Sequence, residues 1–199
     1  LGALAALLGV AAAGLYASWG LSLSHYDAKA HLVVARRILD SLTPSWEQIG
    51  AVWLPLPHVL NALPVQVDAL YRTGGSAIAI SVAAFALTAA CLAALVMRLT
   101  GSRAGAGLAA ALVALNPSTL YLQSTPMTEP LMLGLTLAAV AMLVEWCVVA
   151  DSDNERANLQ VRRIGIVFAL ACLTRYEAWP VTVVALAGAV LTRRASQSF

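Results

Sequence analysis

The stretch LGALAALLGVAAAGLYASWGLSLSHYDAKAHLVVARR, residues 1–37, contains the sharpest change of character in the chain. Residues 1–23 carry no charged side chain, whereas residues 24–37 contain an aspartate, a lysine, two arginines and two histidines. A membrane-spanning helix needs about 20 mostly apolar residues. Residues 1–23 are therefore expected to cross a bilayer, with the charged residues emerging on one side of it.

The composition of the whole chain agrees with a membrane protein. The 199 residues are 60% apolar and 11% charged, with a mean hydropathy of +0.80, whereas soluble domains are about a quarter charged. The basic residues are scattered, so the net charge of +2 predicts no nucleic-acid partner. Each of the three cysteines lies alone in an apolar run and is interpreted as a small buried hydrophobe. Because the chain opens on Leu1 rather than Met and ends in RRASQSF just after an apolar run, we expect it to be a piece of a longer protein, namely its N-terminal part.

Further apolar stretches predict an all-α, polytopic membrane protein. Uncharged or nearly uncharged runs follow at residues 73–97, 104–122 and 131–150. The last run, residues 164–192, is interrupted by Arg175 and Glu177. It is either one long helix with charges at its centre or two short helices that meet at TRYEAWP.

The distribution of arginines favours the two-helix alternative. With two helices, the arginines of the short connections fall on one side of the membrane: Arg98, Arg103, Arg156, Arg162, Arg163, Arg193 and Arg194. Since Lys and Arg of short loops prefer the cytoplasm, we expect about six transmembrane helices with both ends cytoplasmic. Residues 24–72, 116–130 and the TRYEAWP turn then share the outer face. Residues 150–163 are expected to form a solvated inner connector.

The outer segment, residues 24–72, is expected to contain amphipathic, interfacial helices within a single transmembrane domain that covers residues 1–199. Apolar periodicity predicts a helix over residues 27–42, ended by Pro44. Its expected buried stripe is Leu32, Ala35, Ile38, Leu39 and Leu42. The prolines of VWLPLPHVLNALP predict a short re-entrant or interfacial piece, with Trp46 and Trp53 at headgroup depth.

Asp27 and His31 are spaced to share one helix face, and three interpretations remain open. In the first interpretation the pair binds a metal ion, although two ligands alone do not make a metal site. Alternatively, Asp27 complements the dipole at a helix N-terminus. In the third interpretation Asp27 accepts a proton from an acceptor hydroxyl or amine, while Lys29, His31 and nearby arginines neutralise a phosphate.

Two further charged groups lie at predicted span ends. Glu129, in STPMTEPL, begins the fourth span, so it is either an ordinary helix-start acid or a functional group. Arg175 and Glu177 lie close to membrane depth, where charges are costly and are usually paired or functional. A purely structural Arg175–Glu177 or Arg175–Glu129 pair is the alternative. Glu145, near the inner end of a span, is interpreted as an interfacial residue.

The blocks SHYDAKAHLVVARRI, WLPLPH, TPMTEPL and LTRYEAW, in this order along the chain, resemble the GT-C superfamily of membrane glycosyltransferases. The similarity is to the family 39-like enzymes, which include protein O-mannosyltransferases and lipid A aminoarabinose transferases. It implies transfer of a sugar from a polyprenyl-phosphate carrier to a protein, lipid or glycan acceptor at the outer face. The first loop departs from the family pattern in having one Asp rather than an adjacent acidic pair.

The resemblance also implies roles for particular residues. Asp27 matches the first-loop catalytic acid, and Glu129 matches the second acidic position. The implied substrate-binding positions are Tyr26, Lys29, His31, His58, Arg175 and Glu177. No cofactor is expected, because the leaving group is already a lipid phosphate; a divalent metal is the alternative.

The implied location is the plasma membrane of a bacterium, with the active site on the periplasmic or extracellular face. The competing hypotheses are a transporter-like protein and a non-catalytic polytopic protein. Transporters place charges near the midplane, whereas the charges here lie in outer loops and at span ends.

Overall fold

The computed structural model describes residues 1–149 and 154–197, and these residues form helices and turns without any strand. The long helices are α1 (Gly2–Ser18), α5 (Gly75–Thr100), α6 (Arg103–Ala114), α8 (Glu129–Val149), α9 (Asn154–Cys172) and α10 (Ala178–Gln197). The shorter helices are α2 (Tyr26–Arg37), η1 (Trp46–Ile49), α3 (Leu56–Ala62), η2 (Pro64–Gln66), α4 (Asp68–Thr73) and α7 (Pro117–Gln123). The expected all-α architecture is confirmed for these residues.

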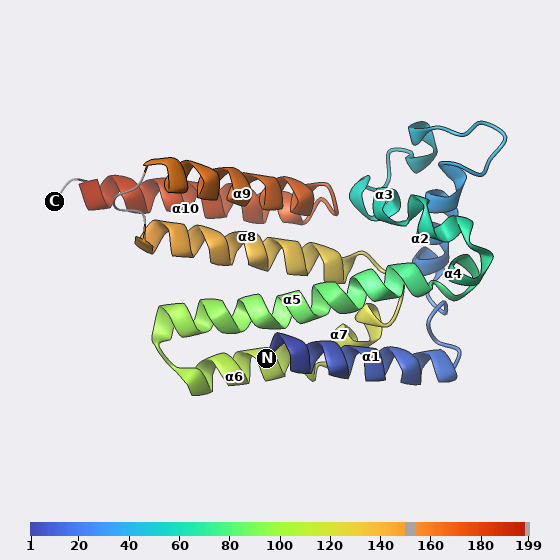
Figure 1. The fold of residues 1–199 in the computed structure, drawn as a ribbon, viewed down its shortest axis with the longest axis horizontal. Coiled ribbons are helices and arrows are strands. Elements are labelled where there is room, and N and C mark those ends of the chain that lie inside the picture. The colour runs from blue at the N-terminus through green and yellow to red at the C-terminus, as the bar shows by residue number, and fades with distance from the viewer. Residues whose placement is uncertain (150–153, 198–199) are drawn as a thin grey trace.

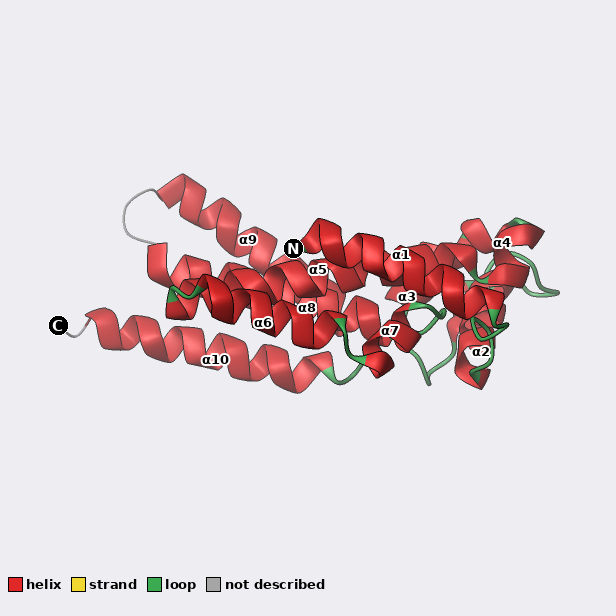
Figure 2. Ribbon diagram, turned by 90° about the horizontal axis from the view of Figure 1, so that it is seen from below, coloured by secondary structure: helices red, strands yellow, loops and turns green. Residues whose placement is uncertain are grey.

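The long helices lie side by side with roughly parallel axes, and α2, α3 and α4 gather at one end of the bundle (Figure 1). Helices α5 and α8 run in the same direction, because α6 and α7, which connect them in the sequence, run back along the bundle. The contact between α5 and α8 is the most extensive in the bundle. The second view shows the same elongated bundle with α2–α4 at its end (Figure 2). Consequently, residues 19–74, 124–128 and 173–177 meet at that end. They overlap the three segments that the sequence assigns to one face, namely residues 24–72, 116–130 and the TRYEAWP turn.

Helix length distinguishes the predicted spans from one another. By length and composition, α5 and α8 are able to cross a membrane, and α6 with α7 makes a third span if this pair, bent by 62°, counts as one. The apolar parts of α1 and α10 are shorter. The described residues thus contain two or three such helices, fewer than the expected six.

Particular turns shorten or divide the predicted helices. Helix α1 ends at Ser18 rather than residue 23, since Gly20 adopts the left-handed φ of +73°. The third predicted span is divided at Asn116, whose side chain caps α7 ahead of Pro117. The result is a bend between α6 and α7 instead of one straight helix.

The two-helix interpretation of residues 164–192 is confirmed, because α9 ends at Cys172 and α10 begins at Ala178. The expected inner connector is wrong in part: residues 150–153 lie outside the described residues, but α9 already begins at Asn154.

The predicted outer helix over residues 27–42 is also too long. Helix α2 ends at Arg37, where the backbone N–H groups of Leu39 and Asp40 both donate to the carbonyl of Arg36. Leu32, Ala35 and Ile38 are buried, but Leu39 and Leu42 are 47% and 104% exposed. The prediction was too long because the apolar pattern of the sequence continues through this turn, where the helix has already ended.

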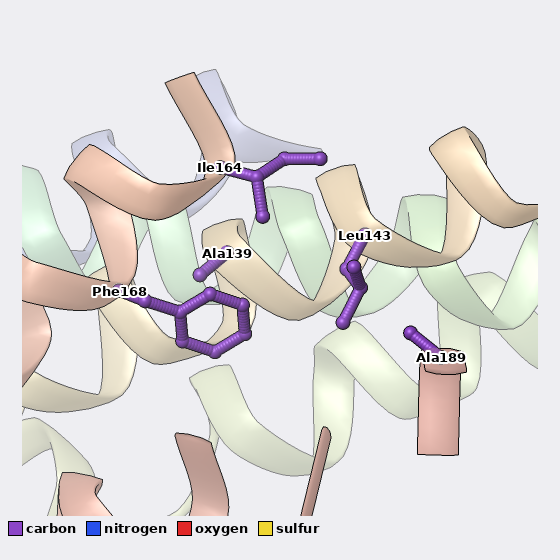
Figure 3. Close-up of a cluster of buried hydrophobic side chains, with 5 residues drawn as sticks. All are labelled: Ala139, Leu143, Ile164, Phe168 and Ala189. Atoms are coloured by element: carbon purple, nitrogen blue, oxygen red, sulfur yellow. The ribbon is translucent and has the colours of Figure 1, made fainter. Parts of the chain in front are cut away.

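Small residues set the spacing of the helices that position the site. Gly134 of α8 lies so close to α5 that a Cβ atom there would be 2.7 Å from the carbonyl oxygen of Ala84. Close backbone approach at small residues is typical of membrane helix pairs. Further along, α8, α9 and α10 enclose a buried cluster of Ala139, Leu143, Ile164, Phe168 and Ala189 (Figure 3). This packing holds the α9–α10 turn beside the start of α8.

Candidate functional site

A cleft of about 290 Å³ opens at the end of the bundle that carries α2 and α3. Its walls come from α2, from residues 52–58, from the start of α8 and from the α9–α10 turn. Six of the eight predicted site residues line it: Asp27, His31, His58, Glu129, Arg175 and Glu177. The fold therefore brings together charged and polar groups that are up to 150 positions apart in the chain (27 to 177).

Tyr26 and Lys29 do not line this cleft. Both side chains are exposed on α2, Tyr26 at 82%. Helical spacing explains this placement, because residues one or two positions from Asp27 cannot share its face. The arginines of α2 also lie elsewhere: Arg36 pairs with Asp40 and Asp68. Among the residues that the structure describes, Arg175 is therefore the cation that lines the cleft.

Arg175 lies at the centre of a network that joins the α9–α10 turn to α8. Its Nη1 is 3.0 Å from Oε1 of Glu129 and donates to Oγ1 of Thr128 at 3.1 Å. Its Nη2 and Nε donate to the two carboxylate oxygens of Glu177 at 2.7 and 3.3 Å. Both structural pairs considered from the sequence are therefore present at once.

The network keeps Arg175 and Glu177 ionised. Burial opposes ionisation of Arg175, but the hydrogen bond to Glu177 and the surrounding carboxylate charges raise its pKa overall. Asp27 contributes to this effect through its charge. The hydrogen bond from Arg175, with a further one from its own backbone N–H, lowers the pKa of Glu177. At neutral pH the turn therefore presents a guanidinium and a carboxylate.

Glu129 combines a helix-start position with an unsatisfied atom. It is the first residue of α8, where an acid is favourable. One oxygen, Oε1, pairs with Arg175, whereas Oε2 is buried and has no hydrogen-bond partner among the described residues. A buried acceptor without a partner is costly. Oε2 of Glu129 is therefore available to accept a hydrogen bond from a ligand in the cleft.

Asp27 occupies the first turn of α2 but does not cap it. The cap is His25, whose Nδ1 accepts from the backbone N–H of Asp27 at 3.2 Å. No hydrogen bond or ion pair of the Asp27 carboxylate is found within residues 1–149 and 154–197. The position suits the helix dipole, and the carboxylate also faces the cleft with free acceptor capacity.

His31 and His58 form a buried pair whose tautomers follow from their partners. Nδ1 of His58 is 3.1 Å from the carbonyl oxygen of Leu54, which can only accept, so this nitrogen carries the proton. Nε2 of His58 then accepts from Nδ1 of His31 at 3.1 Å. With both rings neutral, Nε2 of His31 has a lone pair for which the described part of the chain offers no hydrogen-bond partner.

The environment keeps both rings neutral. Burial, followed by the proximity of His58, Arg175 and His25, lowers the pKa of His31 to about 3. Burial also lowers the pKa of His58, against a smaller opposing effect of the bond to Leu54. That His31 neutralises a phosphate stays a prediction; with its pKa lowered in this way, the neutral ring is a hydrogen-bond acceptor at neutral pH.

Sequence reasoning missed the aromatic and threonine groups of the cleft. Trp53, expected at headgroup depth, packs on His31 with ring centroids 4.5 Å apart. Tyr176 donates to the carbonyl oxygen of Ala51 at 3.3 Å and lines the same cleft. The only sequence signal for Thr128 was its position next to Glu129.

The charge balance of the cleft is negative. Asp27, Glu129 and Glu177 face one guanidinium, Arg175, so the formal charge is −2 when both histidines are neutral. Carboxylate and imidazole acceptors beside aromatic rings suit a polyhydroxylated ligand that donates hydrogen bonds.

Among the described residues no three His, Cys, Asp or Glu side chains group as a metal site. Comparisons of the chain with family models, with curated proteins and with solved structures gave no match.

Proposed function

We propose that the chain is the catalytic part of a membrane glycosyltransferase that moves a sugar from a polyprenyl-phosphate carrier to a protein, lipid or glycan acceptor. The observation that supports this most directly is the Asp27 carboxylate, which has no ion-pair partner among the described residues and lies in a cleft that also contains Arg175. This arrangement combines a base with a cation at the end of an apolar bundle, where a lipid-linked donor meets water.

In the proposed reaction Asp27 is the general base. It takes the proton of the acceptor hydroxyl as the acceptor oxygen bonds to the anomeric carbon of the sugar. The bond from this carbon to the phosphate oxygen breaks, and its electron pair leaves with the polyprenyl phosphate. Arg175 stabilises the departing phosphate. No nucleotide or metal is part of this scheme.

The remaining groups orient the sugar. The buried Oε2 of Glu129 and the free Nε2 of His31 accept hydrogen bonds from sugar hydroxyls. Trp53 and Tyr176 offer ring faces to the apolar side of the sugar. The negative cleft is thus assigned to the hydroxyl-rich part of the donor, with its phosphate on Arg175.

We further propose six membrane crossings with the cleft on the outer face of a bacterial plasma membrane. In support, Arg98 lies in the last turn of α5 and Arg103 begins α6, and these helix ends lie at the end of the bundle opposite to α2–α4 (Figure 1). A cysteine in place of Leu42 should react with an impermeant maleimide from outside, and one in place of Leu159 should not. The reverse labelling pattern contradicts this orientation.

The decisive experiment assays the full-length protein against a panel of polyprenyl-phosphate sugars, with Asp27→Asn as the test variant. A positioned base contributes about 10²–10⁴-fold, so transfer should fall by at least about 100-fold while donor binding survives. If Asp27 served only the helix start, Asn would do equally well. Normal transfer by the folded variant excludes Asp27 as the base.

A further inference from the structure

The guanidinium of Arg175 has two edges with different surroundings. Nη1 is bound on the protein side by Glu129 and Thr128, at 3.0 and 3.1 Å. The other edge, formed by Nε and Nη2, meets the two carboxylate oxygens of Glu177 at 3.3 and 2.7 Å. The first edge anchors the arginine to α8, and the second is held by a residue of its own turn.

Glu177 is much easier to remove from Arg175 than Glu129 is. The Glu177 side chain is 58% exposed, against 25% for Glu129. Exposed ion pairs contribute little net stability, because water solvates the separated charges. Glu177 is able to rotate into water from the turn without disturbing the anchored edge.

The pairing of Glu177 has the geometry of an anion site. Two parallel N–H donors of a guanidinium match two oxygens of a carboxylate or of a phosphate equally well. We propose that the Nε/Nη2 edge of Arg175 is an anion subsite of the cleft, that Glu177 occupies it in the free protein, and that the phosphate group of a ligand displaces Glu177 on binding. This inference deepens the proposed function, and the identification of the phosphate as a lipid carrier rests on that function.

The charge balance of the cleft favours such an exchange. With Asp27, Glu129 and Glu177 all facing the cleft, an incoming phosphate meets three carboxylates and one guanidinium. Rotation of Glu177 into water removes the negative charge nearest to the free edge. The affinity of the wild-type protein for phosphate therefore includes the cost of separating Glu177 from Arg175.

The test compares Glu177→Gln with the matched variant Glu47→Gln in the full chain. Glu47 is an exposed acid of η1 that does not line the cleft, so its loss changes the net charge equally. Binding of farnesyl phosphate, inorganic phosphate and farnesyl alcohol is measured in detergent. Glu177→Gln should bind farnesyl phosphate about threefold to fivefold more tightly than the wild type, and Glu47→Gln should not.

Binding of each ligand tests a different part of the inference. Tighter binding of farnesyl phosphate alone supports a subsite for lipid phosphates, and tighter binding of inorganic phosphate as well supports one that reads the phosphate group itself. Equal affinities of Glu177→Gln and wild type for both phosphates overturn the inference. So does an equal gain for farnesyl alcohol, which has no anion.

A second variant tests whether phosphate binding needs the two parallel N–H donors of the Nε/Nη2 edge. Arg175→Lys, made in the Glu177→Gln protein, keeps a positive charge for Glu129 but offers no paired donors. It should weaken farnesyl phosphate binding at least about tenfold; unchanged binding overturns the inference. Phosphate binding that follows these expectations in a protein without sugar transfer refutes the proposed function alone. Transfer without the Glu177 effect refutes the inference alone.

Discussion

The two ends of the bundle each place an arginine and a glutamate beside a cavity, with opposite results. At the α2–α3 end, Arg175 is paired with Glu129 and Glu177. At the other end, Arg98 of α5 and Glu145 of α8 line a cavity of about 410 Å³ whose other walls are apolar. Both of these side chains are exposed, and within the described residues no ion pair joins them. The same residue types therefore form a network at one end and a solvated rim at the other.

The difference originates in the backbone that carries each arginine. Arg98 lies in the last turn of α5, where the helix dipole favours a cation and water reaches it. Arg175 lies in a tight turn whose neighbour Thr174 is buried. The backbone N–H of Leu56 donates to the carbonyl oxygen of Leu173 at 2.9 Å, which ties this turn to the outer segment. A fixed turn directs its arginine across to another helix, whereas a helix end leaves its arginine in water.

The largest expected difference between the two ends is in catalysis. Arg175→Ala should lower sugar transfer by about 10²–10³-fold, the range for loss of one preorganised donor to a developing negative charge. Arg98→Ala should leave transfer unchanged in the same assay. Similar losses from both variants would indicate that the pairing at the cleft has no special role.

The next effect concerns the close contact of α5 and α8. Gly134→Ala places a Cβ 2.7 Å from the Ala84 carbonyl oxygen and should destabilise the protein by about 1–3 kcal/mol. Gly165→Ala, on α9, meets no neighbour within 4 Å and should be neutral or stabilising by up to about 1 kcal/mol. Thermal unfolding in detergent measures both. Equal stability of the two variants would contradict the close packing that positions the cleft.

A smaller effect is expected for the coupling within each Arg–Glu pair. A double-mutant cycle on Arg175 and Glu129 should give about 1 kcal/mol, since both side chains are partly screened by water. The cycle on Arg98 and Glu145 should give less than about 0.5 kcal/mol. Chemical unfolding of the Ala and Gln variants supplies the values. A larger coupling at Arg98 would overturn the comparison.

The smallest effect distinguishes a helix cap that serves stability from one that also positions a functional group. Ser102 caps α6 at the far end, and Ser102→Ala should cost about 1 kcal/mol without changing transfer. His25 caps α2 beside Asp27, so His25→Ala should lower transfer as well as stability. Unfolding and transfer assays on both variants test this. Unchanged transfer by His25→Ala would show that the cap does not position Asp27.

Most of the helices and much of the cleft could be predicted from the sequence. Uncharged runs located α5 and α8, and the arginine distribution favoured the break between α9 and α10 that the structure contains. Helix ends were less accurate, because Gly20 and the turn after Arg37 end helices whose apolar pattern continues. Trp53 was assigned from its residue type alone, and its contact with His31 was not predicted.

The sequence by itself determined the membrane-like composition, the approximate helices and the gathering of Asp27, Glu129 and Arg175 at one end. These properties depend on local composition and on the alternating direction of successive helices, which short windows of sequence contain. Only the tertiary structure decided that Arg175 pairs both with a mostly buried Glu129 and with an exposed Glu177, that burial lowers the pKa of His31, and that the cleft has a negative formal charge. Pairing, burial and tautomers depend on distances between segments far apart in the chain, and those distances exist only once the helices have packed.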